Sequence, residues 1–129
     1  AFQQVTTIST TTGDLTLNPT DNVVAGAGVF YRGSVTATIT ASTTQTQGNG
    51  ALVSEINEVS VCANVNDTVT LPTAVAGMRC VVMNNGAQTL RIFPALGDNL
   101  GAGVDTATTL AAGSNVVYQS FDATNWESI

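Results

Sequence analysis

The chain has 129 residues with nine carboxylates, three arginines and neither lysine nor histidine, so its formal net charge is −6. Charged residues make up 9% of the sequence, against about 25% in an average soluble domain. Three scattered arginines cannot neutralise a run of phosphates, which argues against nucleic acid as a partner. Without histidine, neither a Ser-His or Cys-His nucleophile pair nor an imidazole zinc site can form. A carboxylate-dependent glycosidase is the one enzyme class left open, and we expect neither an enzyme nor a cofactor.

The length predicts one domain at residues 22–129, preceded by an extended N-terminal arm at residues 1–21. The longest apolar run, at residues 23–31, contains two glycines and is too short to span a membrane, so we expect no membrane partner. No signal peptide is visible, and Ala1 is what removal of an initiator methionine would leave. We therefore expect a complete, non-secreted product.

The arm is rich in Gln and Thr, and residues 2–12 offer only Phe2, Val5 and Ile8 for burial. Such a segment frays in an isolated monomer. We expect a neighbouring copy or another partner to hold it, with these three side chains in the interface.

Residues 34–42 and 58–66 alternate strictly between apolar and polar side chains, which predicts two half-buried strands. On the first, Val35, Ala37, Ile39 and Ala41 are expected to face the core. On the second, the valines and Ala63 are expected to face the core and Cys62 the polar side. Residues 51–57 are ambiguous, because Leu52 and Ile56 also fit one helical turn.

Shorter strands follow, with turn residues between them, at residues 68–71, 78–83, 89–93, 108–110 and 115–121. Asn84-Asn85-Gly86 predicts a hairpin that pairs residues 78–83 with 89–93. Trp126 is expected to cap the core. Many short strands without a helical stretch predict an all-β fold, a single antiparallel β-sandwich or jelly-roll-like domain.

Cys62 and Cys80 belong to a chain without an export signal, which favours a reducing compartment. Two free, half-buried thiols are the favoured prediction, and a disulfide is the alternative. Two isolated cysteines are too few for a metal site, so we predict none.

Glu55 with Glu58, or Asp98 with Asp105, could serve glycoside cleavage only as an opposed pair in a sugar-sized cleft. With few aromatic residues to stack sugars, solvated turn acids are the favoured interpretation. Residues 100–105 have a faint similarity to a calcium-binding repeat. A calcium ion among Asp98, Asn99 and Asp105 is the less favoured alternative to a flexible loop.

The predicted hairpin places Arg79 and Arg91 on paired strands, where they could share a face. They either form surface ion pairs with carboxylates or lie in a subunit interface, bound to a neighbour's carboxylate. The strands also lack the lysines that often protect sheet edges. Either the sheet closes into a barrel or the edges are covered in an oligomer, and we expect a homo-oligomer.

Two stretches resemble proteins of tailed-phage virions. Residues 11–20, TTGDLTLNPT, are similar to short segments that recur in phage fibre and tail proteins. From about Thr43 to the C-terminus, the chain resembles a module of capsid decoration and fibre-associated proteins, with LP, AGM, NNGA, FPALGD, LAAGS and DATNW in that order.

The resemblance implies a viral structural protein and carries over no catalytic residue. It implies a phage capsid decoration (cement) protein, a small all-β homotrimer that binds the major capsid protein on the outer head surface of the virion. Such a protein stabilises capsomer junctions and is assembled in the host cytoplasm. A trimeric fibre or spike module that binds a receptor or a glycan is the alternative function.

Overall fold

The computed structural model describes residues 33–129, which form eight strands and no helix. The all-β prediction is therefore confirmed. The predicted arm and its boundary at residue 22 lie outside the described residues, as do Phe2, Val5 and Ile8. The strands are β1 (Val35–Thr40), β2 (Ile56–Val61), β3 (Thr68–Thr70), β4 (Arg79–Asn84), β5 (Leu90–Phe93), β6 (Thr108–Leu110), β7 (Asn115–Ser120) and β8 (Trp126–Ser128).

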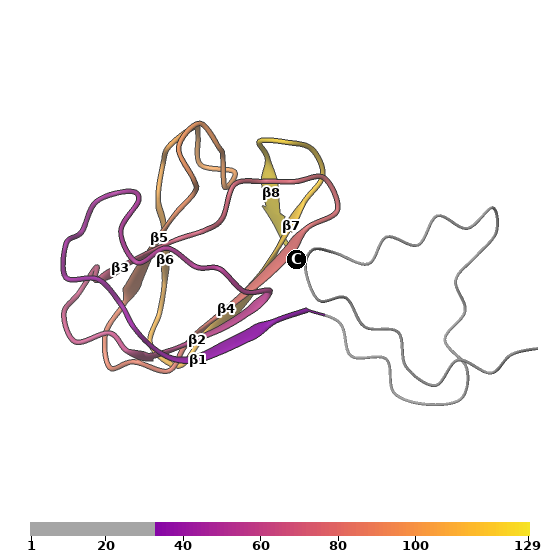
Figure 1. Cartoon of the computed structure of the whole chain (residues 1–129). Coiled ribbons are helices and arrows are strands. Elements are labelled where there is room, and N and C mark those ends of the chain that lie inside the picture. Colours follow the sequence, from indigo (N-terminus) through magenta and orange to yellow (C-terminus); the bar gives the residue numbers. More distant parts are fainter. Residues whose placement is uncertain (1–32) are drawn as a thin grey trace, which may run out of the picture. The chain divides into compact units, whose positions relative to one another are not determined.

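The strands form two sheets, consistent with a β-sandwich (Figure 1). One sheet has five strands in the order β1-β2-β4-β7-β8, and the other has three in the order β3-β5-β6. The chain changes sheet at every step from β2 to β5. Strands that follow one another in sequence therefore do not pair with each other over this part of the fold.

The pairing instead joins strands that are one full winding of the chain apart. β2 lies parallel to β4, with Ile56 opposite Val81, and β3 lies parallel to β5, with Thr68 opposite Arg91. β1 lies parallel to β2, and a parallel bridge joins Ala51 to β3, so residues 35–52 form the preceding turn. This is the winding of a short parallel β-helix.

The last three strands close the fold with antiparallel ladders. β6 pairs with β5, β7 with β4, and β8 with β7. The ladders β1–β2, β2–β4 and β3–β5 are parallel, so the expectation of a purely antiparallel fold is wrong. A crossover between sheets brings the chain back in its original direction, whereas a hairpin reverses it.

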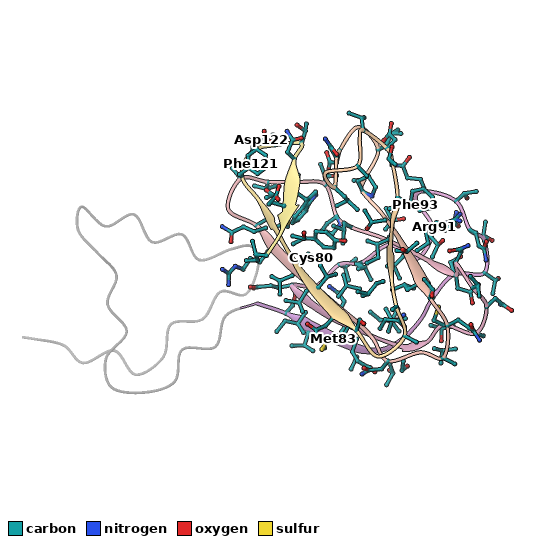
Figure 2. All side chains as sticks on the ribbon, turned by 180° about the vertical axis from the view of Figure 1, so that it is seen from behind. Cys80, Met83, Arg91, Phe93, Phe121 and Asp122 are labelled. Atoms are coloured by element: carbon teal, nitrogen blue, oxygen red, sulfur yellow. The ribbon has the colours of Figure 1, made fainter. Side chains whose placement is uncertain are left out.

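Side chains from both sheets meet in the interior (Figure 2). The largest fully buried apolar side chains are Trp126, Leu71, Leu90, Ile92, Val59, Val69 and Val82. Removing each from water stabilises the fold by about 1.5–3 kcal/mol. Trp126, which was predicted to cap the core, is only 1% exposed.

The predicted hairpin at Asn84-Asn85-Gly86 is wrong, because β4 and β5 lie in different sheets. The segment is a corner where the chain crosses from one sheet to the other. Asn84 is fully buried there, and its Nδ2 donates hydrogen bonds to the carbonyls of Gln88 and Leu110. Asparagine and glycine favour a hairpin turn and also suit this corner. A hairpin turn and a corner both need side chains that accept hydrogen bonds from the nearby backbone, and both need a small residue.

The predicted orientation of Cys62 is also wrong. β2 ends at Val61, and Cys62 is fully buried while Val61 and Val65 are 44% and 57% exposed. Alternation holds only while the chain stays extended. The alternation already fails at Val61, the last residue of β2, so the burial of Asn57 and Val59 on one face does not continue to residue 66.

Candidate functional site

The two arginines that were predicted to share a face lie on different sheets. Arg79 begins β4, whereas Arg91 lies in β5, beside Phe93 and apart from Cys80 and Met83 of β4 (Figure 2). The prediction is wrong because it depended on the hairpin. Arg79 donates from Nε and Nη2 to Oε1 of Gln119 on β7, at 3.4 and 3.3 Å. An interface role for either arginine stays a prediction.

Glu58 joins three segments of the five-stranded sheet. Its Oε2 accepts a hydrogen bond from the backbone N–H of Thr38 at 2.7 Å, and its Oε1 accepts one from Nδ2 of Asn85 at 3.0 Å. These bonds, the Thr38 bond first, lower the pKa of the Glu58 carboxyl. A general acid at neutral pH needs a raised pKa. Glu58 therefore has the chemistry of a structural acceptor.

The Gly-rich loop after β5 is held by its own polar side chains. Oδ2 of Asp98 accepts the N–H of Ala74 at 2.7 Å, and Oδ1 of Asp105 accepts the N–H of Gly97 at 2.6 Å. Oδ1 of Asn99 accepts two backbone N–H groups of the loop. Thus each side chain considered for calcium has an oxygen engaged in holding the loop. Within residues 33–129, no group of three metal-ligating side chains is gathered.

Cys62 and Cys80 are free, as predicted, and fully buried rather than half-buried. Burial, reinforced by the charge of Glu55, raises the pKa of the Cys80 thiol to about 12. Burial also raises the pKa of the Cys62 thiol. Because the thiolate is the nucleophile and the metal ligand, both cysteines serve as packing groups.

A surface hollow of about 380 Å³ opens where β1, β2 and β4 begin. Its lining includes Ser34, Ser54, Glu55 and Arg79. Glu55 is the one carboxylate among the described residues that line it, so the hollow lacks the opposed pair that glycoside cleavage requires.

The feature of the described fold that suits binding best is an open sheet edge. The five-stranded sheet is not closed, and within residues 33–129 it ends at β1 on one side and at β8 on the other. β1 has six residues and β8 has three. Because an edge strand offers unpaired backbone groups to another chain, β1 is the better candidate interface.

The backbone of β1 directs alternate residues to its open side. The carbonyl of Ser34 accepts the N–H of Ile56 at 2.9 Å, so Ser34 faces β2. In a parallel ladder the next residue faces the opposite way. Val35 and Ala37 therefore direct their N–H and C=O groups away from β2.

The side chains of β1 are also accessible. The strand has no charged residue and no fully buried one, and Val35 is 64% exposed. At Thr38 the backbone adopts a φ of 61° and the pairing with β2 becomes irregular. The regular part of the open edge is thus residues 35–37.

The alternation of residues 34–42 correctly predicts a strand here, but its prediction that Val35 and Ala37 face the core is wrong, because both are exposed. The signal that could have identified an open edge was the lack of protecting charge in residues 34–42.

Comparison of the chain with protein-family models, with curated proteins and with solved structures finds no match. No helix of the described residues is long and apolar enough to cross a membrane.

Proposed function

We propose that the chain is a viral structural protein, a phage capsid decoration (cement) protein that binds the outer head surface and stabilises capsomer junctions. The observation that carries the proposal is the uncharged strand β1, whose residues 35–37 form an open edge within residues 33–129. The order of the motifs resembles that of virion proteins, which suggests that such an edge would be used in the assembly of a virion.

The mechanism is mechanical and needs no reactive group. A strand of a second copy, or of the major capsid protein, adds to the open side of β1 by main-chain hydrogen bonds. Each such bond contributes about 0.5–1.5 kcal/mol net, so a single short edge binds weakly. A homotrimer presents the edge three times, and simultaneous binding on a lattice multiplies the affinity.

The charge of the chain suits an exterior position. With nine carboxylates against three arginines, the protein has little affinity for packaged nucleic acid. We place it on the outer capsid surface of the virion, after assembly in the host cytoplasm.

A trimeric fibre or spike module that binds a receptor or a glycan is the second candidate. The parallel winding of β1, β2 and β4 favours it, because further turns can be added to a β-helix at its open end. The same edge would then join the module to a preceding segment of a fibre.

Immunogold labelling of the source virion with an antibody against the chain separates the two. Gold spread evenly over the head supports a decoration protein. Gold confined to the tail or to one vertex rejects it in favour of the fibre module, and glycan binding is then measured on the purified chain.

Ala37→Lys tests the edge itself. A charge beside the outward backbone of β1 should block strand addition and leave the β1–β2 ladder intact. We expect the variant to bind undecorated capsids at least tenfold more weakly, which corresponds to a loss of about 1.4 kcal/mol of binding free energy. Co-sedimentation with the capsids measures this binding.

Ala112→Lys is the matched control, because Ala112 lies in the exposed turn between β6 and β7. It makes the same chemical change away from β1 and should bind like the unmodified chain. Equal binding by both variants, with circular dichroism unchanged, would reject the β1 edge as the interface.

A further inference from the structure

The sequence contains two Asn-Gly dipeptides, Asn49-Gly50 and Asn85-Gly86. Asparagine before glycine is prone to lose its side-chain amide, because the glycine nitrogen can reach the amide carbon with little steric hindrance. We propose that Asn49 is a site of spontaneous deamidation in the folded protein and that the fold protects Asn85.

Both glycines are required by close packing. A Cβ on Gly50 would lie 2.3 Å from the backbone oxygen of Thr68, and a Cβ on Gly86 would lie 2.3 Å from the backbone nitrogen of Cys62. Real Cβ atoms do not approach backbone so closely, so the fold excludes larger residues at both positions. Packing thus fixes the glycine of each dipeptide, and the reactivity of each asparagine depends on how it is held.

Asn49 lies half-buried in a turn between Gly48 and Gly50, whose φ angles are 88° and 60°. Its Nδ2 donates to the carbonyl and to Oγ1 of Thr46, both within the same turn. In the described part of the chain, the attacking N–H of Gly50 donates no hydrogen bond. The Thr46 bonds are local to the turn, so breaking them disrupts no tertiary contact. The turn is attached to β3 through Thr70, whose Oγ1 accepts the N–H of Gly48 at 3.0 Å, but the reacting side chain and the Gly50 N–H take no part in that attachment.

At Asn85 both reacting groups are held by hydrogen bonds, the side chain by β2 and the glycine nitrogen by the neighbouring Asn84. Its Nδ2 donates to Oε1 of Glu58 on β2 at 3.0 Å. The N–H of the buried Gly86 donates to Oδ1 of Asn84 at 3.1 Å. Asn84 is itself fixed by the carbonyl of Leu110 on β6, at 3.0 Å. Although the Asn85 side chain is exposed, Gly86 is buried, so attack by its nitrogen requires opening of the corner, which is a rarer event than movement within the half-buried turn at Asn49.

The reaction consumes one water and releases one ammonia. The Gly50 nitrogen gives up its proton and forms a bond to Cγ of Asn49, while the Cγ–Nδ2 bond breaks and the amine leaves as ammonia. Water then opens the resulting five-membered imide at either carbonyl, giving aspartate or isoaspartate. No electron transfer occurs, and the chain gains one negative charge.

The product alters the contact between the first and second turns of the winding. The carbonyl of Asn49 accepts from Oγ1 of Thr70 at 2.8 Å, and the carbonyl of Gly50 accepts from the N–H of Thr70 at 3.1 Å. Isoaspartate routes the main chain through the former side chain, which lengthens it by one methylene group and turns the Asn49 carbonyl into a free carboxylate. We expect the modified protein to lose this attachment to β3.

Trypsin separates the two sites, because the arginines at positions 32, 79 and 91 place Asn49 in peptide 33–79 and Asn85 in peptide 80–91. The full chain is incubated in mildly alkaline buffer, folded or in concentrated urea. It is then digested and analysed by fragmentation mass spectrometry and by isoaspartyl methyltransferase labelling. In the folded protein, deamidation should accumulate several times faster at Asn49 than at Asn85. In urea the two rates should be similar, because the dipeptides are then equally free.

Asn49→Gln is the control variant, and it should abolish the signal in peptide 33–79 without changing the fold. Glu58→Gln should accelerate deamidation at Asn85, because it removes the charge that anchors the side chain. Equal rates at the two sites in the folded protein, or faster modification at Asn85, would overturn the proposal.

Discussion

At the scale of single residues, burial separates two leucines that lie close together in sequence. Leu90 in β5 is fully buried, whereas Leu96 in the following loop is 83% exposed. We expect Leu90→Ala to lower the free energy of unfolding by about 2–5 kcal/mol, because it removes core contacts and leaves a cavity. The measurement is the urea midpoint followed by the fluorescence of the buried Trp126.

Leu96→Ala makes the same chemical change at the surface and should alter the free energy of unfolding by less than about 0.5 kcal/mol. A similar loss in both variants would mean that Leu96 is covered in solution, for example by another copy of the chain.

At the scale of elements, two corners between the sheets differ in how tightly they are packed. Gly86 packs against the backbone of Cys62, and nothing lies within 4 Å of a Cβ built on Gly77. Gly86→Ala should therefore destabilise the fold by about 3 kcal/mol or more, because rigid backbone has to move. The free energy of unfolding is measured by urea denaturation.

Gly77→Ala is the comparison, since it meets no steric obstacle and only strains a φ of 85°. We expect this substitution to lower the free energy of unfolding by about 1–2 kcal/mol. If Gly77→Ala proves the more damaging variant, the corner at residues 84–86 is looser than the structure indicates.

The strands could be predicted from sequence, but their partners could not. Residues 68–71, 108–110 and 115–121 match β3, β6 and β7, because alternation and turn residues are local signals. Parallel pairing between successive turns, as between β2 and β4, leaves no local signal. The one pairing signal that was used, Asn84-Asn85-Gly86, belongs to a corner.

The candidate site was predictable only in part, for the same reason. The absence of lysine indicated unprotected edges, yet strand order decides which strand is an edge, and strand order is not encoded locally. Residues 35–40 were assigned a core face because alternation marks a strand whether or not a second sheet covers it.

At the scale of the whole molecule, carboxylates act mainly as acceptors that hold backbone in place. The carboxyls of Glu58, Asp105 and Asp122 all have lowered pKa values. The largest causes are hydrogen bonds from the Thr38 backbone, the Gln47 side chain and the Thr124 backbone, respectively. At these three carboxylates, therefore, hydrogen-bond donors stabilise the negative charge.

This arrangement predicts acid sensitivity, and Asp122 allows the clearest test. Its Oδ1 accepts the backbone N–H groups of Thr124 and Asn125 at 2.8 and 2.7 Å, which lowers its pKa from the ordinary value of 3.8. The unfolded chain therefore takes up this proton at a higher pH than the folded chain. The stabilisation is fully present above pH 3.8 and is lost as the pH falls from there through the folded pKa.

We expect the urea midpoint to fall as the pH is lowered through this range. Asp122→Asn keeps an acceptor oxygen but does not titrate, so its midpoint should start lower at neutral pH and fall less on acidification. A variant whose midpoint follows the same pH dependence as the unmodified chain would show that Asp122 does not contribute to the acid sensitivity. The remaining slope of the variant then measures the combined contribution of the other carboxylates to the acid sensitivity of the fold, Glu58 and Asp105 among them.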